Sequence, residues 1–429
     1  MNAIITICAK NYIGLSSILG ESIKASNPDV DFYIFVADEF LDDEKKEYNI
    51  PSNVYISKDV LNIPAETWDK MSFQYDLTEL CTSIKPYCLE WVFNNKKCDN
   101  VLYMDPDILV FNKLDHIWNE LGNHSMLITP HVTSIEEKFS GQITEEGLLF
   151  SGLYNLGFIG VHNDDNSRLM LKWWQNRLEN KCFVDVNKSY FYDQRWMDFL
   201  PCFFDTKVKI DRHLGCNLAP WNFYERRVIE KDNTFYVKNR ISGDSVENIL
   251  LFVHYSGYNY KSLIGNLVEQ KNIKLIADYD DIHSILNYYK DFLIKNKELF
   301  LTYIKLNYSY SVFSNGINIQ PYHRRIYRSL VEKGHDVNNP FDANSNYFKV
   351  LSSSRLIPSE NSTSIPKMKQ EDVSSTYGKQ LYYLNMLSRI VLKIIGVSRY
   401  MQLMKLMRYY SRFESQIHLV DKNYLKNNL

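Results

Sequence analysis

Two aspartates separated by one residue are the clearest chemical signal in the chain. Asp105 and Asp107 stand in YMDPDILV, directly after the apolar run at residues 101–104. Carboxylates at the carboxyl end of a central strand lie over the cleft of an open α/β sheet, and their hard oxygens suit Mg²⁺ or Mn²⁺ bridging a diphosphate. The pair therefore indicates a nucleotide-sugar site, although an isolated D-x-D also occurs by chance in turns.

A histidine at the end of a later apolar run offers a third metal ligand. His254 stands in FVHYSG, and Lys261 follows it in the chain. One imidazole beside Asp105 and Asp107 favours Mn²⁺ somewhat over Mg²⁺, because imidazole is a softer ligand than carboxylate. The alternative is a histidine that only serves the structure at a strand end.

The first apolar run ends in residues that suit a nucleotide base. The segment ITICAKNY leads from a strand expected at residues 3–9 into Asn11 and Tyr12, where backbone amides and the Tyr12 ring can meet a uridine-like base. An ordinary strand running into a helix N-terminus fits the same residues.

The order of apolar runs predicts the fold that positions these residues. Strand-length runs at residues 3–9, 32–37 and 101–104 alternate with helical stretches at residues 13–24 and 77–93. This alternation predicts an α/β fold with a mainly parallel sheet covered by helices on both faces. Further strands are expected at residues 126–129, 155–161 and 249–255, with a helix at residues 167–178.

Composition excludes several classes of protein. The 429 residues are 45% apolar and 23% charged, which is typical of a water-soluble chain with a large core. A net charge of -2 excludes nucleic-acid binding by bulk electrostatics, and 7 Trp, 31 Tyr and 23 Phe exclude a disordered chain. The seven cysteines contain no C-x-x-C pair and indicate reduced thiols of a cytoplasmic protein.

The two ends of the chain differ in character. Residues 1–9 are too short for a signal peptide, and no uncharged stretch reaches the ~18 apolar residues of a spanning helix, so neither secretion nor membrane spanning is expected.

Residues 373–413 carry seven basic residues and no acidic one; removing these charges from the total of -2 leaves -9 for the rest. A basic helical stripe opposite a Leu/Met/Tyr face fits the anionic inner surface of the cell membrane, or a terminal hairpin docked on the body or a dimer partner.

An ordered series of short blocks between residues 3 and 261 resembles the GT-A glycosyltransferases, most closely family 8, which are retaining enzymes with a bound divalent metal. The blocks are the Asn11-Tyr12 pair, Lys85 where the family has arginine, the D-x-D at Asp105 and Asp107, Asn155 in YNLGF, the Asp193-Gln194 pair, and HYSG, which contains His254 and Gly257 and precedes Lys261. Ala9 stands where the family has an aspartate that contacts the base, and Lys261 follows one extra residue and lacks the Pro-Trp after it.

The resemblance implies sugar transfer from a nucleotide-diphosphate donor, UDP-linked, with Mn²⁺ or Mg²⁺ on Asp105, Asp107 and His254. Lys85 and Lys261 would add positive charge at the leaving diphosphate. The donor sugar would bind Asn155, Asp193 and Gln194, with Gln194 near the anomeric carbon for front-side, retaining attack. Asp193 is the candidate base if the enzyme inverts.

The segment from Asn315 to Arg328, followed by Asn339-Pro340-Phe341, resembles a recurrent ending of bacterial polysaccharide-assembly glycosyltransferases, which implies a glycan or lipid-linked glycan acceptor in surface polysaccharide synthesis. Its arginine cluster (Arg324, Arg325, Arg328) would face phosphate or form a solvated helix face. We expect a catalytic domain at residues 1–265, its helical completion at 266–350, a Ser-rich linker at 351–378 and a basic helical tail at 379–429.

Three other functions compete with this interpretation. A sugar-1-phosphate nucleotidyltransferase needs a glycine-rich loop where this chain has CAKNY. A glycosidase needs two carboxylates facing each other across a sugar, for which Asp105 and Asp193 are the candidates. The third is a non-catalytic nucleotide-sugar or glycan-binding relative that acts as an assembly component.

Overall fold

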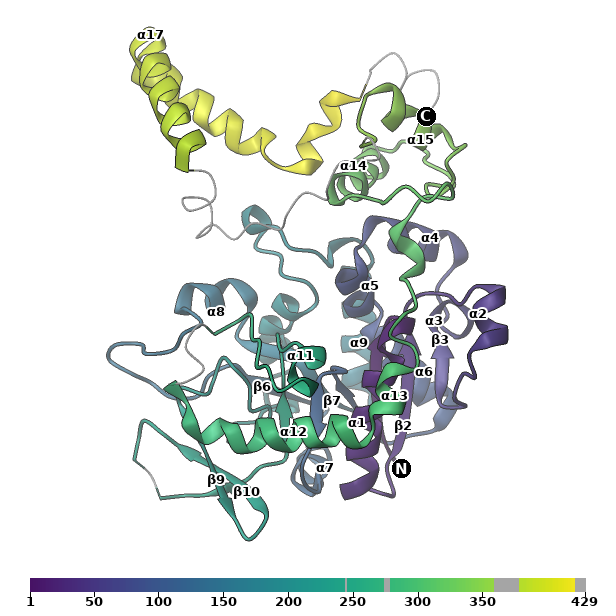
Figure 1. Cartoon of the computed structure of the whole chain (residues 1–429), viewed down its shortest axis with the longest axis vertical. Helices are drawn as coiled ribbons and strands as arrows, with labels where there is room; N and C mark the ends of the chain where they lie inside the picture. The colour runs from purple at the N-terminus through teal and green to yellow at the C-terminus, as the bar shows by residue number, and fades with distance from the viewer. Residues whose placement is uncertain (244, 274–277, 359–377, 421–429) are drawn as a thin grey trace. The chain divides into compact units, whose positions relative to one another are not determined.

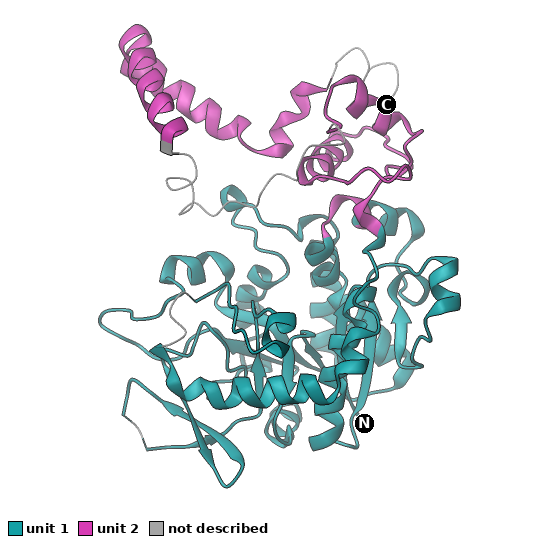
Figure 2. Ribbon diagram, viewed as in Figure 1, with its two compact units in different colours: residues 1–71, 77–309 teal, residues 72–76, 310–429 magenta. Residues whose placement is uncertain are grey.

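A computed structural model describes residues 1–243, 245–273, 278–358 and 378–420. The chain divides into two compact units, residues 1–71 with 77–309 (unit 1) and residues 72–76 with 310–429 (unit 2), as Figure 2 shows. The division falls inside the segment 266–350, which was expected to complete the catalytic domain: residues 266–309 belong to unit 1 and residues 310–350 to unit 2. Most of the linker expected at residues 351–378 lies outside the described residues.

A seven-stranded sheet in the order β3-β2-β1-β4-β7-β6-β8 forms the centre of unit 1 (Figure 1). Its strands are β1 (Asn2–Cys8), β2 (Asp31–Val36), β3 (Val54–Ile56), β4 (Asn100–Met104), β6 (Met126–Pro130), β7 (Tyr154–His162) and β8 (Val208–Ile210). β1 pairs in parallel with β2 and β4, whereas β7 runs antiparallel between β4 and β6. The expected mixed, mainly parallel sheet flanked by helices is confirmed.

Alternation along the strands lets helices cover both faces of the sheet. Leu102 and Met104 of β4 pack in one cluster with Leu19 and Leu121, which belong to α1 (Ile13–Ser26) and α7 (Asp115–Leu121). The side chain of Tyr103 points the other way, because successive strand residues face opposite sides. Its ring lies 4.3 Å from the Lys85 ammonium at the start of α6 (Lys85–Lys96).

The helix expected at residues 77–93 is two helices, α5 (Leu77–Ser83) and α6. Pro86 stands in the first turn of α6, where its missing N–H costs nothing. The other helices of this unit are α2 (Asp42–Glu47), α3 (Ser57–Val60), α4 (Ala65–Gln74, whose last residues count with unit 2), α8 (Glu145–Ser151), α9 (Asp165–Lys181), α10 (Leu200–Phe204), α11 (Tyr260–Ile264), α12 (His283–Lys295) and α13 (Lys297–Leu301).

Two smaller sheets complete unit 1. The strand expected at residues 249–255 is divided into β11 (Asn248–Ile249) and β12 (Phe252–His254). β11 joins β10 (Thr234–Asn239) and β9 (Arg226–Lys231), whereas β12 pairs antiparallel with β5 (Ile108–Val110). This second pairing sets Ile108 opposite His254.

Unit 2 contains α14 (Pro321–Glu332), α15 (Asn346–Ser353) and α17 (Gly378–Tyr410), which changes direction at Gly396 with a φ of 76°. By length and composition, Lys379–Tyr410 is long and apolar enough to cross a membrane. The sequence predicts no such helix, because its uncharged stretches are too short, whereas a span tolerates one or two basic residues.

The arginine cluster of α14 holds the unit together instead of facing phosphate or solvent. The Arg324 guanidinium is buried and donates to the carbonyls of Phe73 (2.7 Å), Tyr75 (2.8 Å) and Tyr310 (2.5 Å). Arg325 donates to the carbonyl of Gln74, and Arg328 pairs with Glu414 at 3.0 Å. These bonds satisfy backbone carbonyls that burial would otherwise leave unpaired.

Replacing Arg324 by methionine should destabilise the protein strongly. Each buried carbonyl left without its donor costs about 1–3 kcal/mol, so we expect Arg324→Met to lower the free energy of unfolding by about 3 kcal/mol or more. Denaturant unfolding measures this change. Arg355→Met, at an exposed position of the same unit, is the control and should change it by less than about 0.5 kcal/mol. Equal effects of the two substitutions would contradict the structural role of Arg324.

Candidate active site

Two backbone segments bring Asp105, Asp107 and His254 together. The aspartates form the turn between β4 and β5, and His254 ends β12. The Tyr255 N–H donates to the Asp107 carbonyl at 2.9 Å, which extends the β5–β12 ladder into the turn. The His254 Nε2 atom lies 3.1 Å from Asp107 Oδ1 and 3.6 Å from Asp105 Oδ2. One ligand atom from each residue lies within 4.8 Å of the others, so a single cation can reach all three.

Asn155 fixes the orientation of the His254 ring. Its Oδ1 atom accepts hydrogen bonds from the Gly157 N–H and from Asn217 Nδ2, and it lies 3.3 Å from His254 Nδ1. Because this oxygen can only accept, Nδ1 carries a proton, which leaves Nε2 as the nitrogen that can bind a cation between the two carboxylates. This is the tautomer that a metal ligand needs. Asn155 was expected to bind the donor sugar; in the structure it contacts the histidine.

Gly157 leaves the space in which these ligands meet. A Cβ atom at this position would lie 2.3 Å from His254 Cε1 and 2.8 Å from Asp105 Oδ2. The Asp105 N–H donates to the Gly157 carbonyl at 2.8 Å, so the strand also holds the aspartate backbone. Any side chain here would therefore displace a candidate ligand.

The electrostatics of the cluster favour a positive charge. Burial works against ionisation of Asp107, but the His254 imidazole and the Tyr260 hydroxyl outweigh it and hold the pKa of Asp107 below its ordinary value. Burial also disfavours the imidazolium, yet the carboxylates of Asp107 and Asp105 raise the pKa of His254. Two hard oxygens and one imidazole suit Mn²⁺ or Mg²⁺.

Two tyrosines hold the aspartates from the sides. The Tyr103 hydroxyl donates to Asp105 Oδ1, and the Tyr260 hydroxyl donates to Asp107 Oδ2 at 3.1 Å. The sequence analysis missed both. The spacing of Tyr103 could have indicated its contact, because it stands two residues before Asp105 and residues two apart in a strand share a face. Tyr260 lies beside the candidate Lys261, but nothing in its spacing relates it to Asp107.

Lys85 and Asp193 form a buried ion pair. The Lys85 Nζ atom lies 2.7 Å from Asp193 Oδ2 and donates to the Leu156 carbonyl at 2.7 Å. Both side chains are nearly inaccessible, with exposed fractions of 2% and 4%. Burial raises the pKa of Asp193, and Lys85 partly offsets this rise. Lys85, expected at the donor phosphates, thus bonds to the strand behind them.

Both the oxygen and the nitrogen of the Gln194 side-chain amide form hydrogen bonds. Its Oε1 atom accepts from the Leu156 N–H at 3.0 Å, and its Nε2 atom donates to the Ser151 carbonyl at 2.9 Å. Gln194 and Lys85 thus bond to the N–H and the C=O of the same residue of β7. Together they hold the start of the strand that carries Asn155 and Gly157.

Two adjoining pockets open beside the aspartates. One, of about 340 Å³, is lined by Ala9, Tyr12, Asp105 and Asp107 among others. The other, of about 430 Å³, shares Tyr12 and Tyr260 with the first and adds Asn11 and Lys261. The buried Asn11 Oδ1 atom has no hydrogen-bond partner among the described residues.

Gly257 shapes the turn that follows β12. Its φ of 81° lies in the left-handed region, which glycine adopts without strain. A Cβ atom there would lie 2.7 Å from Asn272 Nδ2. Lys261 follows in α11, whose first turn is capped by Asn259.

Comparison with known proteins identifies the class. The model of glycosyl transferase family 8 matches residues 3–262. The chain belongs to glycosyl transferase family 8, whose members are GT-A glycosyltransferases that use nucleotide-sugar donors and usually a divalent metal.

Three individual relatives have between 13% and 26% sequence identity to this chain. Uncharacterized protein YfnD of Bacillus subtilis (strain 168) is 26% identical over 226 residues, which are 51% of this chain and 65% of that relative. The chain thus matches less than two thirds of its length. The galactosyltransferase LgtC, solved with donor and acceptor sugar analogs, is 19% identical over 59% of this chain and 87% of its own, with a TM-score of 0.35. The glycosyltransferase GlyE of Streptococcus pneumoniae TIGR4 is 13% identical over 72% and 66%, with a TM-score of 0.37.

Replacing Gly157 by alanine should disrupt the cation site. Because the new methyl group would overlap His254, we expect Gly157→Ala to weaken Mn²⁺ binding at least about tenfold, the loss typical when ligand orientation is disturbed. Electron paramagnetic resonance of free Mn²⁺ measures the affinity. Gly147→Ala is the matched control, since its Cβ meets only ordinary contacts in α8. Unchanged Mn²⁺ affinity in a folded Gly157→Ala protein would contradict the assigned cluster.

Proposed function

We propose that the chain transfers a sugar from a UDP-linked donor to a glycan or lipid-linked glycan acceptor in bacterial surface polysaccharide synthesis, using Mn²⁺ or Mg²⁺. The observation that carries this proposal is the convergence of Asp105, Asp107 and His254 beside two pockets. A cation held there by Asp105, Asp107 and His254 would offset the negative charge that develops on the leaving diphosphate.

The pockets supply the groups that a nucleotide needs. Tyr12 is 42% exposed and lines both pockets, so its ring is available for stacking on a base. The unpartnered Asn11 Oδ1 atom can accept a hydrogen bond from a base or ribose. Lys261 lines the larger pocket and provides positive charge for the diphosphate. Lys85 acts indirectly, because it is held in the ion pair with Asp193.

The environment of Asp193 supports the retaining proposal. A base that takes the acceptor proton must reach the acceptor hydroxyl. The Asp193 carboxylate is 4% exposed and faces the Lys85 ammonium at 2.7 Å, so an acceptor has little access to it. Front-side attack with retention needs no such base, and Gln194 then supports the strand beside the donor sugar.

Loss of one aspartate should abolish transfer without unfolding the protein. We expect Asp105→Asn to lower kcat at least about 100-fold, because the cation that offsets the leaving-group charge loses a ligand. Donor turnover with Mn²⁺ measures the effect. Asp291→Asn, at an exposed site in α12, is the matched control and should retain full activity.

The wild-type product distinguishes the remaining outcomes. Its NMR coupling constants should report the same anomeric configuration as the donor, and inversion would overturn the retaining proposal. If UDP-sugars with Mn²⁺ raise the melting temperature but neither transfer nor hydrolysis occurs, the chain is a binding relative instead. No response to any nucleotide would overturn the donor assignment.

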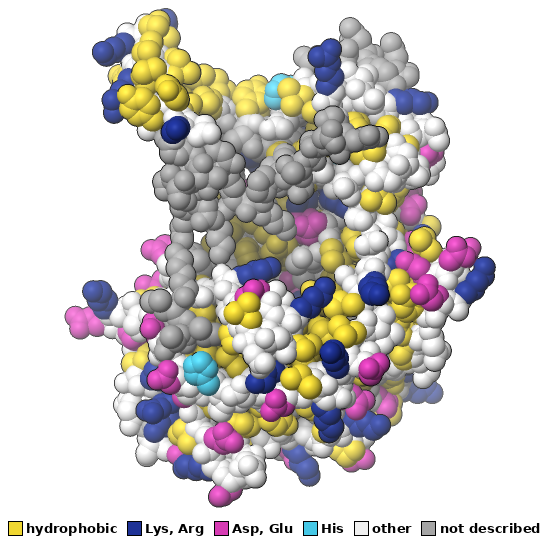
Figure 3. All heavy atoms as spheres, in the orientation of Figure 1, with side chains coloured by type: hydrophobic (Ala, Val, Ile, Leu, Met, Phe, Trp, Pro, Cys, Tyr) yellow, Lys and Arg dark blue, Asp and Glu magenta, His cyan; other side chains and the backbone are white. Residues whose placement is uncertain are grey.

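We also propose that α17 lies on an anionic surface at the inner face of the cell membrane, which makes this cytoplasmic protein peripheral. Figure 3 shows apolar side chains along this helix with Lys and Arg among them. Leu387, Ile394 and Val397 are 55%, 76% and 61% exposed. An apolar surface of this kind beside basic residues fits the boundary between lipid headgroups and acyl chains.

Neutralising the helix should release the protein from anionic vesicles. Each basic residue near such a surface contributes about 1 kcal/mol, so changing Arg389, Lys393, Arg399 and Lys405 to glutamine should weaken binding to phosphatidylserine vesicles about 100- to 1,000-fold. Co-sedimentation measures this. Substitution is preferable to truncation, because Glu414 and Val420 beyond α17 pack into unit 2.

The control changes four exposed lysines of unit 1 (Lys45, Lys46, Lys113 and Lys207) to glutamine and should leave vesicle binding unchanged. Equal release by both sets would show that net charge alone matters. Wild-type protein that resists extraction from cell membranes by high salt and carbonate would show a spanning helix and overturn the peripheral proposal.

A further inference from the structure

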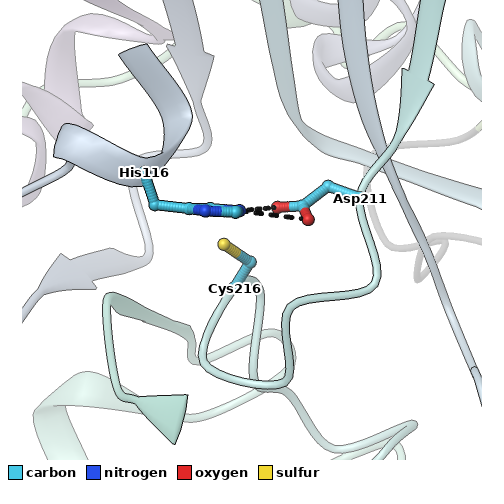
Figure 4. A group of neighbouring side chains, drawn as sticks. All are labelled: His116, Asp211 and Cys216. Atoms are coloured by element: carbon cyan, nitrogen blue, oxygen red, sulfur yellow. Dashed lines mark hydrogen bonds and ion pairs between the residues drawn. The ribbon is translucent and has the colours of Figure 1, made fainter. Parts of the chain in front are cut away.

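A second cluster of metal-binding side chains lies in unit 1, apart from the D-x-D turn. His116 of α7, Asp211 just after β8 and Cys216 each offer a ligand atom within 4.8 Å of the others. Figure 4 shows the three side chains pointing toward one another, His116 from a helix and Asp211 and Cys216 from one loop. Among the residues that the structure describes, only this cluster and the Asp105 cluster have such an arrangement, and they share no residue.

The backbone around the cluster is held firmly. The Cys216 N–H donates to the His213 carbonyl at 2.9 Å, which closes the turn that presents the thiol. Buried Arg226 donates to the Cys216 carbonyl at 2.7 Å. A Cβ atom at Gly215 would lie 1.9 Å from the Ile249 carbonyl oxygen, so only glycine allows this turn so close to the next segment. Cys216 is thus fixed before any ligand arrives.

The ring of His116 is also fixed. It lies 4.6 Å from the ring of His213 and tilts 32° from it. Its Nε2 atom is 3.2 Å from Asp211 Oδ1 and 3.1 Å from Asp211 Oδ2. Nearly equal distances place Nε2 on the bisector of the carboxylate, whereas a single linear hydrogen bond would favour one oxygen. The His213 N–H donates to Asp211 Oδ1 and holds the carboxylate in this position.

We propose that His116, Asp211 and Cys216 bind a Zn²⁺ ion. Imidazole nitrogen, carboxylate oxygen and thiolate sulfur are the three ligand types of zinc sites, and the sulfur distinguishes this cluster from one for Mg²⁺ or Ca²⁺. Tetrahedral bonds of about 2.0–2.1 Å to nitrogen and oxygen separate those atoms by roughly 3.3 Å. The observed 3.1–3.2 Å is close to this separation.

Burial also favours an ion over the bare side chains. Asp211 and Cys216 are 4% and 1% exposed, while the His116 side chain is 32% exposed and leaves a route for water as the fourth ligand. Zinc would displace the thiol proton and neutralise both buried anions at once. Nearby Glu120 and Lys209 pair with each other at 3.0 Å, so their charges largely cancel.

The ion would fasten the loop that leads into the active site. Asn217 directly follows Cys216, and its Nδ2 atom donates to Thr129 Oγ1 at 2.8 Å and to Asn155 Oδ1 at 3.2 Å. Asn155 in turn orients His254. A metal that ties this loop to α7 and to the end of β8 would therefore support the candidate active site from behind, without contacting a donor.

Cobalt substitution tests this proposal independently of enzyme activity. Co²⁺ added to the metal-free full-length protein should produce a sulfur-to-cobalt charge-transfer absorption in the near ultraviolet, because a thiolate is a ligand. Cys216→Ser should abolish the absorption. Cys202→Ser, which removes an exposed cysteine, and Asp105→Asn, which removes a ligand of the other cluster, should both retain it. The zinc proposal therefore stands or falls separately from the proposed function.

A second measurement covers failure of Cys216→Ser to fold. His116→Gln changes a partly exposed side chain, and we expect it to lower the Zn²⁺ affinity at least about 100-fold in competition with a chromophoric chelator, since loss of a ligand exceeds the usual effect of losing its supporting group. No charge-transfer absorption in the wild type, its persistence in Cys216→Ser, or an unchanged Zn²⁺ affinity in His116→Gln would overturn the proposal. In those cases the cluster is a hydrogen-bonded ion pair beside a thiol.

Discussion

The register between β5 and β12 is the constraint on which the candidate active site depends. Their pairing sets Ile108 opposite His254, and the adjoining bond from the Tyr255 N–H to the Asp107 carbonyl ties the turn to the same ladder. A slip of one residue would turn the imidazole to the other face of the strand, because side chains alternate. Burial of Leu109 and Val253 on the opposite side opposes that slip. The apolar pattern of two short strands thus decides where the charged groups meet.

Buried charges reinforce this arrangement at the strand that runs through the site. The Lys85–Asp193 pair and Gln194 hold both backbone groups of Leu156, the residue between Asn155 and Gly157. Removing two charges from water costs several kcal/mol each, and the pair recovers this only with good geometry and further hydrogen bonds. Here the further hydrogen bond runs from the Lys85 ammonium to the Leu156 carbonyl of β7. The pair's contribution is therefore to geometry more than to stability, since it fixes the two residues on which the orientation of His254 depends.

Much of this architecture was predictable from sequence, for reasons that differ between residues. The alternating sheet and helices follow from apolar periodicity, and the D-x-D could be located because it directly follows a buried strand. The roles of Asn155 and Lys85 were harder to predict, since a polar residue near a strand end faces either a ligand or a neighbour, and spacing does not distinguish them. Asn217 and Cys216 gave no signal, because their partners are distant in sequence and no strand pattern flanks them. The two compact units divide between residues 309 and 310, inside the segment 266–350, and unit 2 also includes residues 72–76, a pairing of distant segments that no local pattern reveals.

The loop at residues 211–217 relates the two metal-binding clusters. Cys216 faces Asp211 and His116, while the next residue, Asn217, reaches Asn155 on the other side. Asn217 has a φ of 54°, in the left-handed region, and this turn of the backbone lets one short loop serve two sites without sharing a ligand. Coupling between such sites is carried through packed and hydrogen-bonded contacts and typically amounts to about 1–3 kcal/mol. The loop is held by the bond from the Cys216 N–H to the His213 carbonyl and by the bond from Arg226 to the Cys216 carbonyl, so we expect it to fix positions and not to move. We therefore expect the His116, Asp211 and Cys216 cluster to affect how firmly Asn155 and His254 are held in position. We do not expect it to act as a switch of activity.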